Sequence, residues 1–319
     1  MNALQRKQLF EAEQQKSETE ILRFKGVDGF DVYNCSQPFN YEDKWYLFGR
    51  VERRSEWMRS WVRLFEKVEK NCWKLVEDSM VYQLEDPYIA KIDNNLVMGG
   101  THVQVKKEDK LEAYFGYFYY GQALNDLKYF TTGPRNMKDI RIVQLADGRI
   151  GVFSRPRDKQ LIKEYGSEAL IGFTIIDHLD ELTAEKIANA KILPDLFGNL
   201  EWGGVNQVFL LDTNKIGVIG HLSYLEEEQS VYTVMSFVFD PLTLAVDDYK
   251  IIATRKSYPE GPAKREHLKD CCFPSGMIYH DDENCELFSG IGDTQEGVVK
   301  ITYPFKGYGQ IVNPVLKFS

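Results

Sequence analysis

Five short apolar segments of similar design recur along this chain. Each is a run of apolar residues that ends in small residues followed by a polar or charged one. The five segments are WYLFGR (45–50), LVMGGT (96–101), IGVFSR (150–155), IGVIGH (216–221) and LFSGIGD (287–293). Their starts lie 51 to 71 residues apart. Because such a spacing is typical of radial β-repeats, the sequence predicts an all-β fold, a five-bladed β-propeller.

A turn precedes each of the last four apolar segments, and an unusually polar stretch precedes each of the five. The turns are at 93–95, 146–148, 212–214 and 281–284, and the polar stretches are at 35–39, 85–89, 138–142, 204–208 and 272–276. We interpret each polar stretch as the innermost strand of a blade, since proline is confined to strand edges, strand starts and bulges. Any single stretch taken alone is better interpreted as a polar strand start. Its recurrence in all five repeats favours the blade interpretation.

In a propeller the same position of every blade faces one axial funnel. The residues that end the five apolar segments would therefore meet there. They are Arg50, Thr101, Arg155, His221 and Asp293. This convergence predicts a polar site drawn from the whole chain.

Composition narrows the range of functions. The chain has 319 residues, 48 of them acidic and 39 basic, for a net charge of −9. This balance disfavours nucleic acid or an anionic membrane as a partner. No apolar stretch approaches 18 residues, and the first 20 residues lack the apolar core of a signal peptide. The five cysteines lack metal-ligand spacing, so we expect reduced thiols, a cytoplasmic location and no metal.

The domain organisation is expected to be simple. Residues 1–20 are predicted to form an N-terminal helical extension, and residues 21–319 a single five-bladed β-propeller catalytic domain. A second helix is expected over residues 180–190, where Leu182 and Ile187 would form an apolar face.

The order of several motifs resembles that of a known family. The motifs are Glu85-Asp86-Pro87, Lys138-Asp139, Ser154-Arg155-Pro156, Gly203-Gly204, Gly220-His221, FPSG (273–276) and SGIGD (289–293). They look like the signature blocks of the five-bladed β-mannoside phosphorylases of glycoside hydrolase family 130. The segments DVYN (31–34) and GRVE (49–52) are more similar to the related β-1,2-mannosyltransferase/phosphorylases of glycosyltransferase family 108, formerly a domain of unknown function. Tyr88 and Leu222 also depart from the phosphorylase blocks, which favours the second group.

This resemblance, which covers about residues 30–304, implies an inverting enzyme. It would transfer mannosyl units between β-1,2-linked mannooligosaccharides and phosphate, with mannose 1-phosphate as product or donor. Its small-molecule partners would be the sugar and inorganic phosphate or mannose 1-phosphate as co-substrate, without a further cofactor. A nucleotide-mannose donor and a homo-oligomeric state are left open.

Such a reaction requires one acid and a cationic pocket, because phosphate is itself a nucleophile. Asp86 is the candidate acid, and the resemblance implies that it acts through a sugar hydroxyl. The alternative is that Asp86 only caps a turn before Pro87. The candidate phosphate ligands are Lys138, Arg141, Arg155 and His221, since arginine offers anions a planar pair of donors. His221 would either donate as an imidazolium or orient the phosphate as a neutral ring.

Several other residues are candidate sugar ligands. They are Arg50, Thr101, His102, Asn206 and Asp293, together with Trp202 as a stacking platform. The alternative for Trp202 is a core position, which is the more frequent one for tryptophan. Arg149 and Arg157 are expected to be solvated surface residues.

Two other functions remain compatible with the sequence. A β-mannoside hydrolase of the same fold would need a second carboxylate as general base and no cationic pocket. A non-catalytic carbohydrate-binding propeller would use Asp86 only structurally.

Overall fold

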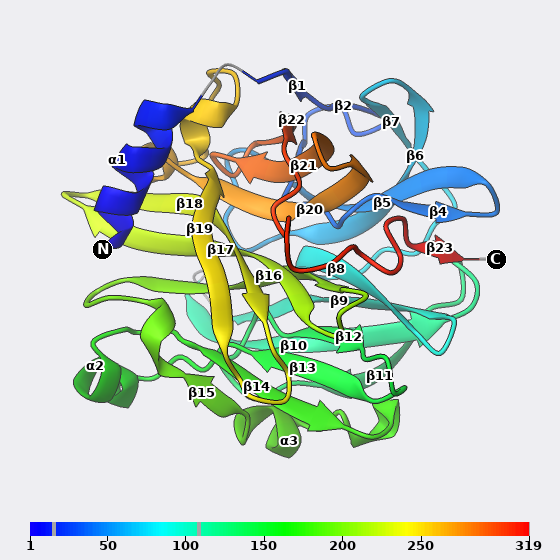
Figure 1. Cartoon of the computed structure of the whole chain (residues 1–319). Helices are drawn as coiled ribbons and strands as arrows, with labels where there is room; N and C mark the ends of the chain where they lie inside the picture. The colour runs from blue at the N-terminus through cyan, green and yellow to red at the C-terminus, as the bar shows by residue number, and fades with distance from the viewer. Residues whose placement is uncertain (15–16, 107–109, 319) are drawn as a thin grey trace.

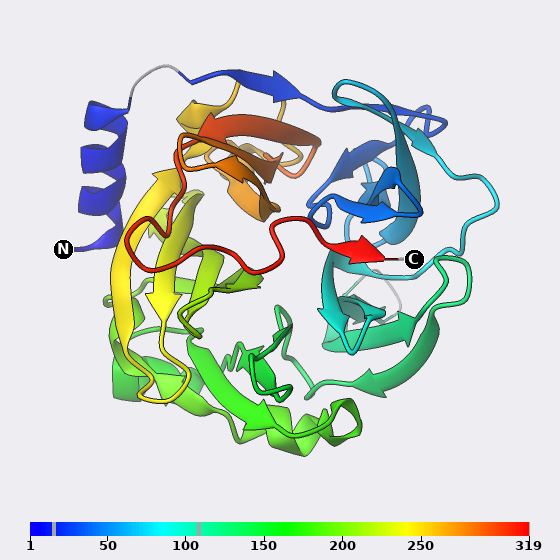
Figure 2. The same ribbon diagram turned by 45° about the vertical axis from the view of Figure 1, so that its right-hand side comes forward.

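The computed structural model describes residues 1–14, 17–106 and 110–318. Its strands form five β-sheets within these residues. Figure 1 shows the chain from the side, and Figure 2 shows the sheets arranged around a common centre.

Each sheet is numbered here by its place along the chain. The first contains β4 (Phe39–Tyr41), β5 (Lys44–Glu52), β6 (Trp61–Glu69) and β7 (Cys72–Leu75), with β2 (Arg23–Lys25), β3 (Asp31–Tyr33) and β23 (Lys317–Phe318) added. The second contains β8 (Glu85–Ile92), β9 (Asn95–Val105), β10 (Leu111–Gly121) and β11 (Lys128–Thr132). The third contains β12 (Arg141–Gln144), β13 (Ile150–Ser154), β14 (Ile171–Ile176) and β15 (Lys191–Leu193). The fourth contains β16 (Trp202–Leu210), β17 (Ile216–Glu226), β18 (Gln229–Phe239) and β19 (Val246–Ala253). The fifth contains β20 (Cys272–Asp281), β21 (Asn284–Ile291), β22 (Gln295–Ile301) and β1 (Thr19–Ile21).

The five apolar segments of the sequence supply one strand to each sheet, namely β5, β9, β13, β17 and β21. Each pairs antiparallel with the strand before it, so the start of one lies beside the end of the other. Glu85 is thus opposite Thr101, and Gly204 is opposite His221. This register brings the polar strand starts next to the residues that end the apolar segments. The predicted all-β, propeller-like fold is confirmed.

The hydrophobic core lies between neighbouring sheets. Phe153 and Phe173 of the third sheet pack against Phe239 of the fourth, with ring centroids 4.7–5.3 Å apart. Similar clusters join the first sheet to the second, the second to the third and the fourth to the fifth. A further cluster joins the fifth sheet back to the first. Burial of apolar surface on both faces of the sheets therefore stabilises a closed ring.

The N-terminal helix is present but shorter than predicted. Helix α1 (Ala3–Glu13) is capped by Asn2, whose side chain accepts a hydrogen bond from the Gln5 N–H. It lies beside β19 (Figure 1), where the Arg6 guanidinium stacks on the Tyr249 ring. From Thr19 the chain continues as strand β1, which pairs with β22.

The helix expected over 180–190 is interrupted. It consists of a 3₁₀ turn (Leu179–Glu181) and helix α3 (Ala184–Ala188), because Thr183 adopts an extended conformation and caps α3. Leu182 and Ile187 are buried as expected. The remaining helical elements are α2 (Lys159–Tyr165) and 3₁₀ turns at Pro194–Leu196, Arg255–Ser257 and Glu266–Leu268.

Three structural features bear on the compositional predictions. No helix in the described ranges is long and apolar enough to cross a membrane. No group of three metal-ligating side chains occurs among those same residues. All five cysteines are buried and unpaired.

Candidate functional site

A cavity of about 330 Å³ opens where the polar strand starts of several sheets meet. We call it the acid cavity. The predicted site residues that line it are Arg50, Asp86, Thr101, Lys138 and Asp293. Arg50 comes from the first sheet, and Asp86 and Thr101 come from the second. Lys138 lies in the loop that leads into β12 of the third sheet, and Asp293 lies just after β21 of the fifth. The predicted convergence of distant strand ends is therefore present.

Asp86 is buried in this cavity, at the start of β8. Its Oδ1 accepts hydrogen bonds from the Asn34 amide at 2.9 Å and from Arg50 Nη1 at 3.0 Å. The β8–β9 register shifts between Glu85 and Tyr88, so a bulge surrounds Asp86. Asp86 is thus held by side chains of the first sheet, not by a local turn alone.

Several acidic and amide residues around the site have a left-handed backbone. The φ angles are +46° at Asn34, +49° at Asp86, +55° at Asp139 and +53° at Asp293. This conformation is uncommon for residues with a Cβ atom, and it is found most often at Asn and Asp. It breaks the alternation of side chains along a strand. Its recurrence at these four positions indicates a strained backbone around the cavity. Strain of this kind is concentrated at functional sites.

Arg50 organises the carboxylates of the acid cavity. Besides Asp86, its Nη2 contacts Glu85 Oε1 at 3.0 Å and Glu52 Oε2 at 3.4 Å. Burial raises the pKa of Glu85, and the Asp86 charge adds to this while Arg50 opposes it. Burial likewise raises the pKa of Asp293. The cavity therefore holds carboxyl groups that retain protons more readily than exposed ones.

A second cavity of about 310 Å³ adjoins the first, and we call it the anion cavity. The two share five lining residues, which are Lys138, Arg157, Ser230, Tyr232 and Phe273. Arg155 lies in its wall and donates from Nη1 to Asp139 Oδ2 at 2.8 Å and from Nε to the Gly203 carbonyl at 2.7 Å. Although burial alone would raise it, the Arg155 and Lys138 charges hold the pKa of Asp139 far below its usual range.

Lys138 lines both cavities and forms no ion pair with any residue that the structure describes. Burial would lower the pKa of Lys138, but the nearby Asp139 and Asp86 carboxylates raise it. The side chain is therefore a persistent cation between the two cavities. Such a group is available to a ligand that carries negative charge.

His221 is buried in the anion cavity as a neutral ring. Burial, and then the charge of Arg155, lowers the pKa of His221 well below its usual value. Its Nδ1 lies 2.8 Å from Asn206 Oδ1, and the Asn206 amide nitrogen donates to the Pro274 carbonyl. Nδ1 therefore donates, and Nε2 is an acceptor with no partner among the described residues. Of the two roles predicted for His221, the neutral one fits.

Three predicted ligands do not line either cavity. Arg141 donates to the Asn206 carbonyl at 2.7 Å and stacks on the Tyr88 ring at 4.4 Å. Asn206 lies behind His221, as described above. The His102 ring stacks on Tyr117, with 4.6 Å between centroids, because alternation along β9 turns it away from its cavity-lining neighbours. Arg141 and Asn206 support the site from behind, and His102 lies outside it.

The structure places two predicted residues at the edge of the anion cavity. Trp202 is 9% exposed and meets Tyr232 edge-on at 6.0 Å, so it is both a packing residue and a cavity wall. Arg157 is exposed, as expected, and it also lines both cavities. It is paired with Glu168 at 2.6 Å, and its side chain is 44% exposed. It therefore belongs to the entrance of the site.

Sequence reasoning did not assign a role to several other lining residues. Asn34 and Glu85 lie inside the motifs that carried the family resemblance, so their positions offered a signal. Tyr232 lies on β18, the third strand of its sheet, where no repeat pattern points to the axis. Asp139 is part of the Lys138-Asp139 motif but faces Arg155 as its counter-ion.

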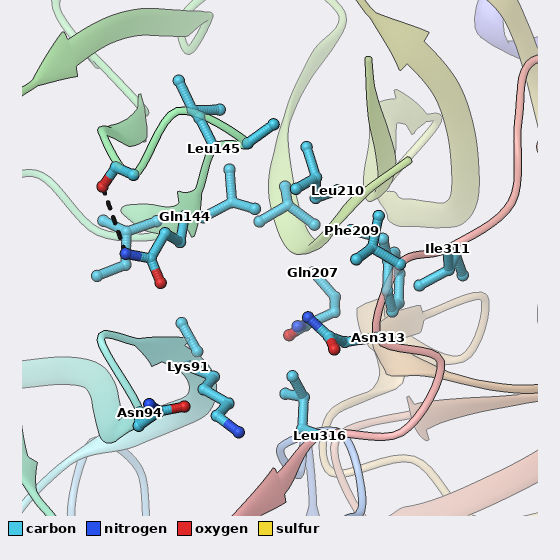
Figure 3. Close-up of a pocket in the computed structure, with 17 residues that line it drawn as sticks. Lys91, Asn94, Gln144, Leu145, Gln207, Phe209, Leu210, Ile311, Asn313 and Leu316 are labelled. Atoms are coloured by element: carbon cyan, nitrogen blue, oxygen red, sulfur yellow. Dashed lines mark hydrogen bonds between the residues drawn. The ribbon is translucent and has the colours of Figure 1, made fainter. Parts of the chain in front are cut away.

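A third cavity of about 470 Å³, larger than the acid and anion cavities, lies at the opposite ends of the inner strands (Figure 3). Hairpin residues such as Asn94 and Gln144 line it, together with Ile311, Asn313 and Leu316 of the C-terminal segment. That segment crosses the middle of the ring in Figure 2. Lys91 alone is ionisable among the described residues that line this cavity. It therefore lacks the acid and the cationic cluster that the other two cavities combine.

One buried carboxyl group beside the site makes stability depend on pH. Glu296 Oε2 accepts the Cys35 N–H at 3.1 Å, one residue along from Asn34. Burial raises the pKa of Glu296 from 4.5 to about 7. The stability that its proton provides is fully present below pH 4.5 and is lost as the pH rises through 7.

The substitution Glu296→Gln removes this titration and keeps a neutral polar group. Between pH 4.5 and 8 the wild-type protein should lose about 3 kcal/mol of unfolding free energy relative to the variant, since one pKa unit corresponds to about 1.4 kcal/mol. Urea unfolding at several pH values measures the difference. A difference that does not change with pH would contradict the assignment.

Comparisons with known proteins identify the family of the chain. The sequence profile of a family described as "Protein of unknown function (DUF1861)" matches residues 8–307. A comparison with curated protein sequences gives no match. A solved mannose phosphorylase from Leishmania mexicana, in complex with phosphate ion, is 48% identical with a TM-score of 0.92, covering 99% of this chain and 97% of that one. A GDP-Man-dependent mannosyltransferase from the same organism is 45% identical with a TM-score of 0.91, covering 99% and 98%.

A more distant structure shares the fold alone. The β-1,2-mannobiose phosphorylase from Listeria innocua, in its β-1,2-mannobiose complex, is 15% identical with a TM-score of 0.61, covering 86% of this chain and 91% of that one. The near-complete coverage at 45–48% identity confirms the resemblance stated from the sequence motifs. The chain therefore belongs to the DUF1861 family, the mannosyltransferase and mannose phosphorylase group of glycosyltransferase family 108.

Proposed function

We propose that this chain is an inverting phosphorylase and mannosyltransferase that acts on β-1,2-linked mannooligosaccharides. The observation that carries the proposal is the junction of the two cavities. One holds the buried Asp86 carboxyl, the other holds Arg155, and Lys138 lies between them. The relatives support it, since one is a mannose phosphorylase and another a GDP-Man-dependent mannosyltransferase.

In the phosphorolytic direction the terminal mannosyl unit would occupy the acid cavity. The C1–O bond to the next sugar breaks, and a phosphate oxygen in the anion cavity forms a new bond to C1 from the opposite face. Inversion converts the β-mannoside into α-mannose 1-phosphate. Asp86 supplies the proton that the leaving oxygen gains, relayed through a sugar hydroxyl as the family resemblance implies. Arg50 and Asn34 hold the carboxyl group in place for that transfer.

The phosphate would be bound by complementary charge and by hydrogen bonds. Lys138 and Arg155 supply positive charge, and Arg157 adds a third cation at the entrance. The unpartnered Nε2 of His221 suits the hydroxyl of a hydrogen phosphate, to which a neutral ring can offer its lone pair. In the synthetic direction the same groups would bind the phosphate of mannose 1-phosphate.

The proposal is tested by incubating the protein with β-1,2-mannobiose, with and without inorganic phosphate. We expect mannose 1-phosphate and mannose in equal amounts, formed only when phosphate is present. Anion-exchange chromatography of the products measures both. Absence of turnover under either condition would leave a carbohydrate-binding role and would contradict the proposal.

A hydrolase is the second candidate, and one observation favours it. Glu85 and Asp293 line the acid cavity together with Asp86, and a hydrolase would use such a second carboxyl group as the base for water. Their raised pKa values and the adjoining cationic cavity argue for phosphate as nucleophile. Free mannose without mannose 1-phosphate, formed in phosphate-free buffer, would identify the hydrolase.

The number of blades, the nucleotide donor, the cellular location and the oligomeric state stay predictions. Because β1 (Thr19–Ile21) is a strand of the fifth sheet, the helical extension ends before Thr19 and not at residue 20 as expected. We propose that the five sheets are five propeller blades of one catalytic domain. The clusters that join each sheet to the next support this count. A nucleotide-mannose donor is checked by supplying GDP-mannose and mannose. A cytoplasmic location, a homo-oligomer and independence from cofactors, nucleic acid and membranes remain expectations.

A further inference from the structure

The mouth of the acid cavity carries an exposed tryptophan. Trp57 belongs to the loop of residues 53–60, which connects β5 and β6, and its side chain lines the cavity. It is 39% exposed, whereas Asp86 in the same cavity is 5% exposed. A large aromatic ring left partly in water beside a polar cavity offers a ready contact surface for a ligand.

The loop that carries Trp57 is fixed at its C-terminal end to Arg50 and Glu52. At its end, Ser60 Oγ accepts a hydrogen bond from Arg50 Nε at 2.8 Å. The Arg59 N–H donates to Glu52 Oε1 at 3.0 Å. The same Arg50 side chain binds Asp86, so the loop and the acid are held by one group.

A second group, the Arg265 side chain, contacts the Trp57 ring. The Arg265 guanidinium lies 5.5 Å from its centroid, a cation–π arrangement. Met58, the next residue, has a φ of +62°, a conformation that costs energy for a side chain of this size. The loop therefore holds the ring at the mouth instead of folding it into the core.

The character of the cavity wall changes from its depth to its mouth. Among the lining residues, Arg50 and Asp86 are 5–6% exposed and form the deep wall, whereas Trp57 and Leu111 are 39% and 51% exposed and lie at the mouth. Arg157, whose side chain is 44% exposed, adds a charge at the same mouth. A mannosyl unit that reacts beside Asp86 occupies the deep part, so the sugar joined to its C1 extends toward the mouth. One face of a pyranose ring consists largely of C–H groups, which pack well against an aromatic ring.

We infer that Trp57 is the platform for the sugar that leaves in phosphorolysis and accepts mannose in synthesis. The inference rests on the proposed function and adds the residue that determines selection of the acceptor. Trp57 makes no contact with phosphate in this arrangement. Its loss should therefore weaken the use of the disaccharide or acceptor and leave the use of phosphate unchanged.

The test compares Trp57→Ala and Trp57→Phe with the wild-type protein in phosphorolysis of β-1,2-mannobiose. Trp57→Ala should raise the KM for mannobiose about 3- to 10-fold, the value of one aromatic contact, with kcat and the KM for phosphate unchanged. Trp57→Phe should restore most of the loss. Tyr129→Ala is the matched control, because Tyr129 is 53% exposed and lies away from both cavities.

Two results would overturn the inference. One is an unchanged KM for mannobiose in Trp57→Ala, and the other is an equal effect on mannobiose and phosphate. If the wild-type protein shows no phosphorolysis, the proposed function fails separately. Calorimetric titration with β-1,2-mannobiose then still tests whether Trp57 contacts the sugar. If it does, Trp57→Ala should bind the disaccharide more weakly than the wild-type protein.

Discussion

Replacing Asp86 by Asn is expected to lower kcat/KM for phosphorolysis of β-1,2-mannobiose by about 10²- to 10⁴-fold, the range typical of a lost general acid. The amide oxygen of Asn still accepts hydrogen bonds from Asn34 and Arg50, so the fold should be retained. What disappears is the transferable proton. Initial rates of mannose 1-phosphate release measure the effect.

Two controls separate catalysis from folding. Asp147→Asn removes an exposed carboxyl group in a hairpin turn, where Asp147 pairs with Arg149, and should leave the rate unchanged. Circular dichroism and thermal unfolding of Asp86→Asn should resemble those of the wild-type protein. A well-folded Asp86→Asn variant with a near-normal rate would remove Asp86 from the reaction.

Replacing Arg155 by Met is expected to have two large effects. The KM for phosphate should rise about 10- to 100-fold, because a charged hydrogen-bond donor to the anion is lost. The fold should also be destabilised by about 3–5 kcal/mol, since Asp139 is then left as a buried charge without its closest partner. Phosphate-dependence of the rate and urea unfolding measure these effects.

A double variant distinguishes the two effects. In Arg155→Met with Asp139→Asn, both charges of the pair are absent, so most of the lost stability should return. The weak use of phosphate should persist. Arg149→Met, at an exposed turn pair, is the matched control for loss of an arginine. Recovery of normal phosphate use in the double variant would show that Arg155 acts only through stability.

The fold was predictable because each repeat has a recognisable local sequence pattern. Alternation of apolar residues with turn sequences such as Asp93-Asn94 predicts hairpins, and their recurrence predicts a radial arrangement. Antiparallel register then brings Asp86, Arg155 and Asp293 toward the axis without further information. The sequence pattern thus predicted that these residues converge, and the structure brings them to two adjoining cavities.

The missed features depend on side-chain direction and on distant contacts. Alternation along β9 decides that Thr101 faces the acid cavity and His102 does not. Arg157 reaches the entrance although nothing in its neighbourhood in the sequence distinguishes it from a surface arginine. Burial sets the charge of His221, and burial follows only from the packed structure.

A crystal structure of the protein with mannose and inorganic phosphate tests most directly whether the two adjoining cavities bind the sugar and the phosphate. We predict phosphate in contact with Arg155 and Lys138, and a mannose ring beside Asp86 in the adjoining cavity. Binding of phosphate and mannose elsewhere on the protein, with only water in the two cavities, would contradict this prediction.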